Sequence, residues 1–185
     1  MKKILSIMFY LLVSANLFSQ IKIDKVEEDG SRIIISNNSN IYTGWTNAAA
    51  INLSYLLTAS GLENYQITLC LNEGKMQFEK GRKLLLKFKD NTMMELVNCE
   101  RIGPADYQYQ VTNIGTNYYT FPKFNVSEEE LHKIINGEVV KIRIENDIEF
   151  FDRDIKKNKF SNGLKKAFDA INSRKTVKND VYEGF

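Results

Sequence analysis

Alternation between apolar and charged residues is strictest in EVVKIRIEND, residues 138–147. Val140, Ile142 and Ile144 fall on one side of the expected strand. Charged residues fall on the other side: Lys141, Arg143 and Glu145. Antiparallel strands commonly bury one face and expose the other to water, which gives this pattern without any binding function. We interpret the charged row as the solvated side of a sheet, and we expect the strand to continue through Phe150.

A period of two also runs through the earlier part of the chain and predicts a series of hairpins. Ile51, Leu53 and Tyr55 share an apolar face. The polar Asn52 and Ser54 lie on the opposite face of the same strand. Turn signals separate the predicted strands at three places: Asp29-Gly30, Ser60-Gly61 and Asp90-Asn91.

Two helices are predicted late in the chain, where the period changes. Ser127 and Glu130 form a capping box, so a short helix is expected near 128–136, and Asn136-Gly137 gives its stop signal. A second helix is expected near 158–174, because apolar residues recur there at helical spacing: Phe160, Leu164, Phe168 and Ile171. The chain is thus predicted to be α+β, mainly antiparallel β, folded as a sandwich or a partly closed barrel.

The first residues have the layout of a cleavable secretory signal. Two lysines precede an apolar run from Ile4 to Val13, which is shorter than the roughly twenty residues that a membrane-spanning helix needs. We expect residues 1–19 to be removed, with cleavage after Ala15 or an uncleaved anchor as alternatives. Residues 20–185 are then expected to form a single β-rich domain with a flexible end. Since no cysteine follows the run to carry a lipid anchor, the expected location is periplasmic or secreted.

The charge balance gives no support to nucleic-acid binding. The full chain has 25 Lys and Arg residues against 23 Asp and Glu residues, and both surplus lysines lie in the expected signal. The remaining chain therefore has no basic surplus for a phosphate backbone. Residues 127–151 carry seven acidic and three basic residues, net −4, and residues 152–185 carry five acidic and nine basic residues, net +4. We expect these adjacent segments to neutralise each other within the fold.

Three segments together carry a resemblance: KGRKLLLKFKDNTMMEL (80–96), YYTFPKFNVSEEELHKIINGEVVKIRIEND (118–147) and DIKKNKFSNGLKKAF (154–168). In them a glycine precedes a strand hairpin, and a short helix, a basic-apolar strand and a terminal helix follow. In this order they resemble small uncharacterised exported proteins of Bacteroidetes, over most of the chain after the signal. The resemblance implies export and the fold, and it transfers no activity and no site residue.

Few residues offer catalytic or metal-binding chemistry. His132 is the only histidine, so the chain has no histidine pair for zinc, and its place on the short helix favours exposure to solvent. The calcium-like sequence DRDIK puts Lys156 where an oxygen ligand belongs. Neither a phosphate-binding glycine loop nor a nucleophile elbow occurs. We expect no metal, no cofactor and no enzymatic activity, with a small carboxylate-dependent hydrolase of the glycosidase type as the alternative.

Cys70 and Cys99 are the only cysteines in a chain that is predicted to enter an oxidising compartment. Both lie at the ends of predicted strands. They can form a disulfide if those strands are neighbours and both side chains leave the sheet on the same side. The alternative is two separate buried thiols.

Aromatic residues supply the remaining candidate site. Two aromatic strands are predicted in residues 106–111 and 117–124, and Pro122 indicates that the second is an edge strand or ends there. Five of their residues form a candidate ligand-binding patch: Tyr107, Tyr109, Tyr118, Tyr119 and Phe121. Packing in the core or at a sheet edge is the alternative, since half-buried sheets use tyrosine freely. These observations predict a non-catalytic envelope or secreted protein that binds a protein, peptide or glycan.

Overall fold

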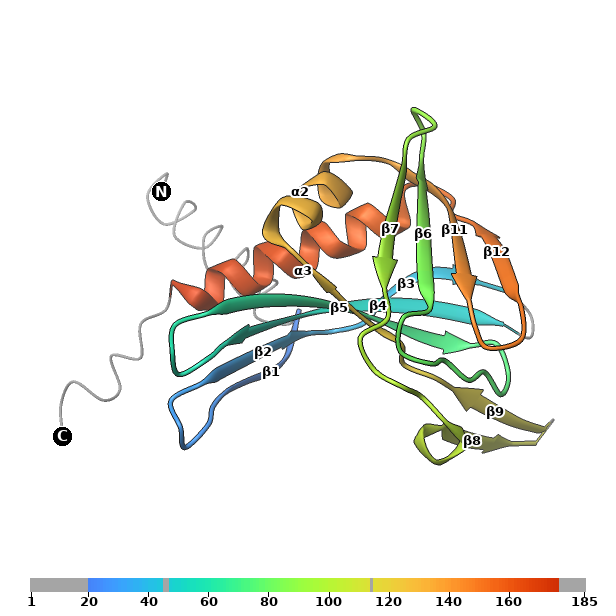
Figure 1. Ribbon diagram of the computed structural model, residues 1–185, viewed down its shortest axis with the longest axis horizontal. Coiled ribbons are helices and arrows are strands. Elements are labelled where there is room, and N and C mark those ends of the chain that lie inside the picture. Colours follow the sequence, from blue (N-terminus) through green and yellow to red (C-terminus); the bar gives the residue numbers. More distant parts are fainter. Residues whose placement is uncertain (1–19, 45–46, 114, 177–185) are drawn as a thin grey trace, which may run out of the picture.

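Two antiparallel sheets, a separate hairpin and two helices make up the chain in a computed structural model (Figure 1). The structure describes residues 20–44, 47–113 and 115–176. The predicted α+β class with mainly antiparallel strands is confirmed, and the two sheets form an open sandwich. The predicted signal at residues 1–19 and the predicted flexible end lie outside the described residues.

The larger sheet has six strands, in the order β1-β2-β4-β5-β10, with β3 also paired to β4. Its members are β1 (Ile21–Val26), β2 (Arg32–Ser36), β3 (Ser39–Thr43), β4 (Ala48–Leu57), β5 (Glu63–Asn72) and β10 (Lys123–Val126). The strand predicted at β4 is confirmed with its alternation, because Ile51, Leu53 and Tyr55 are buried. Asn52 and Ser54 are half-buried on the opposite face.

The smaller sheet has four strands, in the order β12-β11-β6-β7. They are β6 (Lys83–Phe88), β7 (Met93–Val97), β11 (Val139–Glu145) and β12 (Phe150–Asp154). The two aromatic strands form a separate hairpin, β8 (Gln108–Thr112) and β9 (Gly115–Tyr119), after the short 3-10 helix η1 (Pro104–Asp106). A bridge between Thr120 and Leu71 ties the base of this hairpin to β5. The aromatic strand predicted over 117–124 ends before Pro122, which was one of its two predicted alternatives. The residues after Pro122 form a different strand, β10, at the edge of the larger sheet.

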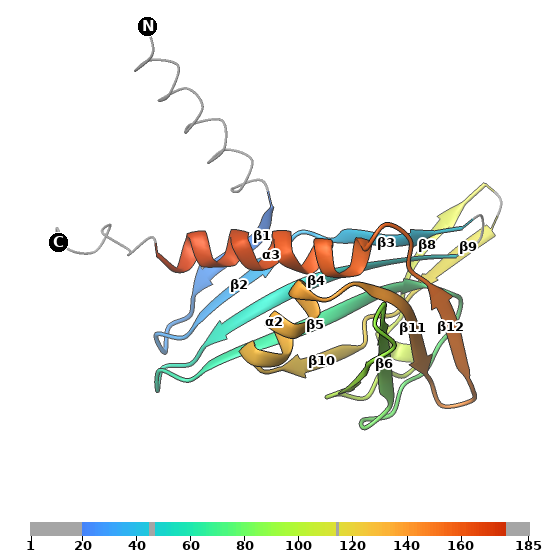
Figure 2. The ribbon, with the colours of Figure 1, turned by 90° about the horizontal axis from the view of Figure 1, so that it is seen from above.

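The helices α2 (Glu128–Asn136) and α3 (Lys159–Lys175) lie on one side of the larger sheet (Figures 1 and 2). The predicted capping box begins α2: the Ser127 hydroxyl accepts from the Glu130 N–H at 3.2 Å, and the Glu130 carboxylate accepts from the Ser127 N–H at 2.8 Å. The predicted apolar stripe of α3 is buried: Phe160, Leu164, Phe168 and Ile171. Neither described helix is long and apolar enough to cross a membrane.

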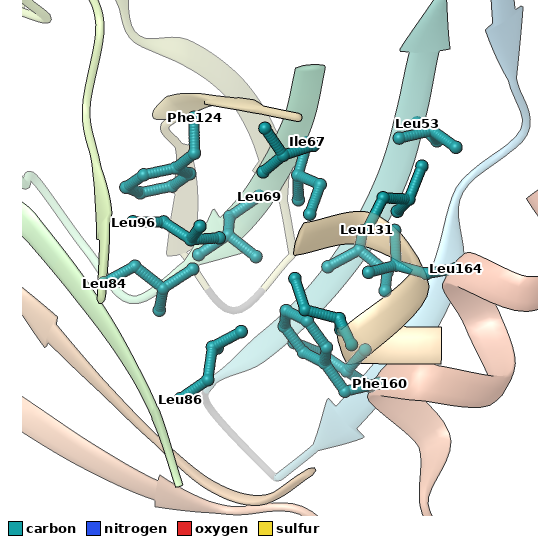
Figure 3. Close-up of a cluster of buried hydrophobic side chains, with 14 of the residues drawn as sticks. Leu53, Ile67, Leu69, Leu84, Leu86, Leu96, Phe124, Leu131, Phe160 and Leu164 are labelled. Atoms are coloured by element: carbon teal, nitrogen blue, oxygen red, sulfur yellow. The ribbon is translucent and has the colours of Figure 1, made fainter. Parts of the chain in front are cut away.

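The core lies between the two sheets and under the helices (Figure 3). Leu84 of the smaller sheet and Leu69 of the larger one point toward each other across it, and both are fully buried. Leu131 of α2 and Leu164 of α3 close a further side. Full burial of a side chain of this size contributes roughly 1.5–3 kcal/mol. The cluster therefore holds both sheets and both helices together.

The predicted hairpin turns are present, with one difference in length. Gly61 (φ 83°) and Asn91 (φ 66°) adopt the left-handed backbone conformation that their turns require. The connection between β1 and β2 spans residues 27–31, instead of the two residues expected from Asp29-Gly30. The Asp29 carboxylate accepts hydrogen bonds from the backbone and the hydroxyl of Ser31, at 2.9 and 2.6 Å, and stabilises this longer loop.

The register of β11 differs from its prediction at one end. A bulge between Val139 and Lys141 shifts the pairing with β6. Val139 is therefore fully buried, and Val140, which was assigned to the core, is only half-buried. The other two predicted core positions, Ile142 and Ile144, are fully buried. A bulge adds one residue to one strand only, so it moves the side chains before it to the opposite face.

The end of β11 also differs from its prediction. The strand ends at Glu145 and does not continue through Phe150, which instead lies opposite Glu145 in β12. The side-chain carbonyl of Asn146 accepts from the backbone N–H groups of Ile148 and Glu149, at 2.9 and 2.8 Å. This asparagine-centred turn reverses the chain although the alternation of residue types continues through it.

The predicted stop of α2 at Asn136-Gly137 is confirmed, but its cause is packing. Gly137 has a φ of −85°, which any residue can adopt. A Cβ atom built on it would lie 2.6 Å from Cδ1 of Phe88. Glycine is needed here because the Phe88 ring packs closely against the end of the helix.

Candidate functional site

The larger sheet has one covered face and one open face. In the described part of the chain, both α-helices lie over the same face, and the opposite face carries neither of them (Figures 1 and 2). Side chains alternate along a strand, so the buried Leu53 points toward α3 and its neighbour Ser54 points to the open face. A pocket of about 570 Å³ hollows this open face.

The pocket has an apolar side and a polar side. Aliphatic residues line the side formed by β1, β2 and part of β4: Ile23, Ile33, Ile35 and Leu56. Uncharged hydrogen-bonding residues of β4, β5 and β10 line the rest: Asn52, Ser54, Asn64, Gln66, Thr68 and Asn125. The strand register creates this division, because Ile35 lies opposite Ser54, Ser54 opposite Gln66, and Gln66 opposite Asn125.

The polar side has hydrogen-bonding groups available to a ligand. The Gln66 amide donates to Asn125 Oδ1 at 3.1 Å and lies 3.4 Å from Cys99 Sγ, so its side chain is held across the strands. The Asn52 amide donates to Asn38 Oδ1 at 2.9 Å. The Oδ1 atom of Asn52 itself is buried without a hydrogen-bond partner among the described residues. A buried acceptor without a partner costs about 1–3 kcal/mol.

Among the described residues, lysines are the only charged residues in the pocket lining. Lys22 on β1 makes no ion pair within the described residues, whereas Lys123 on β10 pairs with Glu100 at 2.8 Å. Burial raises the pKa of the Cys70 thiol on β5, and the charge of Lys22 opposes this increase, which places Lys22 within electrostatic reach of the same face. The pocket therefore has a positive rim and no carboxylate in its lining.

The outer face of the smaller sheet is different, because its charges are paired with one another. Arg143 donates to Asp152 through two hydrogen bonds, of 2.6 and 3.0 Å, and Lys141 Nζ lies 2.9 Å from the same carboxylate. Glu145 accepts from Arg82 at 3.4 Å. These cross-strand pairs support the interpretation of the charged row as the solvated side of a sheet.

The two oppositely charged segments, residues 127–151 and 152–185, do not neutralise each other as predicted. Among the described residues, only the ion pairs of Asp152 with Lys141 and Arg143 join them. Acidic residues of the first segment pair with cations near β6: Glu138 with Lys89, and Glu145 and Asp147 with Arg82. Basic residues of the second segment pair with acids at the two ends of β5: Arg153 with Glu73, and Lys175 with Glu63. Sheet topology sets these partners, since β6 lies beside β11 and α3 crosses the larger sheet.

Three of the five residues of the predicted aromatic patch share one face of the β8–β9 hairpin. Tyr109 lies opposite Tyr118, and the ring of Tyr107 contacts that of Tyr118 edge-on, with centroids 6.4 Å apart. Tyr109 is 69% exposed. Lys75 Nζ lies 4.7 Å from the centroid of the Tyr118 ring. Figure 1 shows the hairpin on the side of the larger sheet that faces away from α3, which is also the side of the open face.

Tyr119 and Phe121 do not join this cluster, which corrects the prediction. The Tyr119 hydroxyl donates to Gln110 at 3.4 Å on the other face of the hairpin, and Phe121 follows the end of β9. Successive residues of a strand point to opposite faces, so Tyr118 and Tyr119 cannot line the same surface.

Cys70 and Cys99 are free thiols, so the predicted disulfide is not formed. Cys70 lies in β5, whereas the N–H of Cys99 donates to the carbonyl of Lys123 at 2.8 Å on the outer side of β10. Because β10 lies between them, two strand spacings separate their backbones, or about 9–10 Å. A disulfide tolerates a Cα separation of about 7 Å at most.

A buried ion pair links the two sheets away from the open face. The Glu73 carboxylate, with 5% of the side chain exposed, accepts from Nε and Nη2 of Arg153 at 3.1 and 2.7 Å. It also accepts from the Tyr42 hydroxyl. Burial, together with the hydrogen bond to Glu73, raises the pKa of Tyr42 and keeps the phenol protonated. Each group has a partner, so we interpret the cluster as a structural connection between β12 and the larger sheet.

Four acidic residues of the described chain have lowered pKa values. Hydrogen bonds from neighbouring hydroxyls or cations lower the pKa values of four carboxyl groups: Asp29, Glu63, Asp90 and Asp152. A general acid for glycoside hydrolysis needs the opposite shift. His132 is exposed on α2, as predicted, and the centroid of its ring lies 5.0 Å from that of the Phe168 ring. Among the described residues, no three His, Cys, Asp or Glu side chains form a group that could hold a metal ion.

The open face was missed in the sequence, although its signal was present. Asn52 and Ser54 are visible as the polar side of one strand, and Gln66 and Thr68 as that of the next. Only the register shows that these residues form one surface and that β10 adds Asn125 to it. Comparison of the chain with models of protein families, with curated proteins and with solved structures finds no significant match.

Proposed function

We propose that this chain is a non-catalytic binding protein, periplasmic or secreted, that holds a protein, peptide or glycan partner on the open face of its larger sheet. The observation that carries the proposal is the pocket of about 570 Å³ on that face, lined in part by uncharged side chains that form hydrogen bonds, of which Asn52, Ser54 and Gln66 are half-buried. Ligand pockets typically combine an apolar lining with a few placed polar groups, and this pocket has both. Export rests on the charged and apolar pattern of residues 1–19.

The tyrosine cluster offers a second contact surface on the same side of the molecule. Tyr109 and Val111 on β8 are 69% and 72% exposed, an unusual degree for large apolar residues of a strand. A partner that is longer than the pocket can extend from the open face onto these side chains. Tyrosine is common at such surfaces because it combines an apolar ring with a polar end.

The test is to probe purified protein on peptide and glycan arrays, and to repeat the measurement with two matched variants. Ser54→Arg places a large charged side chain in the centre of the pocket. Met93→Arg adds the same side chain to the outer face of the smaller sheet, where Met93 is 59% exposed. We expect Ser54→Arg to abolish binding and Met93→Arg to preserve it. Absence of binding on both arrays, or equal binding by both variants, would refute the proposal.

A further inference from the structure

We infer that the open face takes an extended peptide segment in which aliphatic side chains lie beside an acidic group. This inference rests on the proposed function and specifies its ligand. It follows from three properties of the pocket: the separation of its apolar and polar sides, the absence of an exposed ring, and the sign of its charge.

The division of the pocket fits the two kinds of group that a peptide presents. Aliphatic side chains of a peptide can pack against Ile33, Ile35 and Leu56 on one side. Peptide N–H and C=O groups need both acceptors and donors, and a side-chain amide supplies one of each. Gln66 and Asn125 carry such amides on the polar side of the pocket.

The lining favours a peptide over a glycan. Sugar rings commonly stack on exposed aromatic side chains, and the pocket has one aromatic residue, Tyr55. Tyr55 is only 2% exposed, and its ring packs on the covered face against Tyr65, with centroids 5.4 Å apart. No aromatic face among the described lining residues is therefore available for stacking.

The charge of the pocket selects an acidic group. Of the described residues that line it, Lys22 and Lys123 are charged and none is Asp or Glu. Lys123 shares its charge with Glu100, whereas Lys22 has no ion-pair partner in the part of the chain that the structure describes. Complementary charges at the edge of a binding surface determine mainly which partner is accepted and how fast it associates. Lys22 is therefore the residue expected to distinguish an acidic ligand from a basic one.

Fluorescence anisotropy with three synthetic peptides tests this inference. One peptide alternates valine with threonine and glutamate, and its two counterparts carry glutamine or lysine in place of each glutamate. We expect the glutamate peptide to bind best and the lysine peptide worst, with a difference of about fivefold for each surface charge pair gained or lost. The preference is expected to shrink as salt is added, because exposed charges are screened.

Two charge reversals provide the matched comparison. Lys22→Glu should lower the affinity for the glutamate peptide about fivefold and raise the affinity for the lysine peptide. Lys166→Glu makes the same change on the exposed side of α3, far from the open face, and should alter neither affinity. Circular dichroism verifies that both variants are folded, and Lys22→Gln provides a milder substitution with half the charge change.

The outcomes separate the ligand class from the site. Equal affinities for the three peptides, or equal effects of Lys22→Glu and Lys166→Glu, would overturn the acidic peptide as the ligand. Binding of glycans but of no peptide would also overturn the acidic peptide as the ligand, while the proposed function would stand. If Ser54→Arg binds every ligand as well as the wild-type chain, the open face is not the site, and both proposals fail.

Discussion

The outer faces of the two sheets obey the same geometry but carry different chemistry. On the smaller sheet, Lys141 and Arg143 alternate with core residues and pair with Asp152 on the neighbouring strand. On the larger sheet, Ser54 and Gln66 alternate with core residues in the same way, but they are uncharged and border a pocket. Both faces are polar by pattern, but the pocket on the larger sheet has no carboxylate among its described lining residues.

The difference between the two faces shows how charged side chains keep the outer face of a sheet solvated. Charged side chains keep a face in contact with water and discourage association with other strands. The smaller sheet has such a face, with its charges satisfied across the strands. The open face of the larger sheet has few charges, so its polar groups are available to a partner. Four predictions test this contrast, from the largest effect on stability to the smallest.

Substitutions at two adjacent residues of β11 should have the most different effects on stability. Ile142→Asp should unfold the protein or cost at least about 4 kcal/mol, because Ile142 is fully buried and an unpaired charge there lacks any compensation. Arg143→Gln removes only exposed pairs and should cost about 1 kcal/mol or less. Urea denaturation followed by circular dichroism measures both. Similar midpoints for the two variants would show that the register of β11 is misassigned.

The covered face of the larger sheet should be intolerant of added volume. A Cβ atom on Gly163 of α3 would lie 2.9 Å from Cβ of Ser39 and 3.2 Å from Cδ1 of Ile51. Gly163→Val should therefore cost about 1–3 kcal/mol through overpacking. The neighbouring Asn162 is exposed, so Asn162→Val is the matched control and should change stability far less. Thermal unfolding of the two variants makes the comparison, and an unchanged melting temperature for Gly163→Val would contradict the close packing of α3.

The charged face of the smaller sheet should show a small pH dependence. Hydrogen bonds from Arg143 and then Lys141 lower the pKa of Asp152 in the folded protein. A carboxyl group with a lowered folded-state pKa contributes stability above its unfolded value, about 3.9, and this contribution is lost as the pH falls below that value. At neutral pH the free energy of unfolding of the wild-type protein should be higher than that of Asp152→Asn by less than about 1 kcal/mol, since the ion pairs are partly exposed.

Melting temperatures of both proteins between neutral pH and about pH 3 test this sign. The difference in melting temperature between the wild-type protein and Asp152→Asn should become smaller as the solution becomes more acidic, because protonation removes the charge from Asp152. A gap that widens at acidic pH would exclude the ion pairs of this face as its source.

A substitution on the open face should have the smallest effect on stability and the largest effect on ligand binding. Ser54→Arg replaces a half-buried residue that points away from the core, so its unfolding free energy should lie within about 0.5 kcal/mol of the wild-type value. Leu53→Arg, one residue earlier on the covered face, should unfold the protein. Equilibrium denaturation of the pair measures the contrast. A strong destabilisation by Ser54→Arg would mean that this face is part of the core and not a surface for a partner.

Local signals in the sequence determined the elements of this fold. The capping box at Ser127 and the helical spacing from Phe160 to Ile171 predicted both helices, because caps and apolar stripes act over a few residues. Period-two alternation predicted the strands for the same reason, and turn residues such as Asn91 predicted where hairpins reverse. Local signals gave wrong predictions at the Asn146 turn, where a local turn competed, and at the bulge after Val139, where pairing with β6 set the register.

Tertiary structure alone decided which of these elements meet. Alternation gives Ser54 and Lys141 equivalent places on their strands, and no local pattern states which outer face is hollowed. Strand order placed β10 beside β5, which brought Asn125 to Gln66 and put β10 between Cys70 and Cys99. Strand order also chose the partner of each charge and divided the tyrosines between two faces of one hairpin. Pairing between distant segments depends on the packing of the whole core, so the candidate site appears only when the chain is folded.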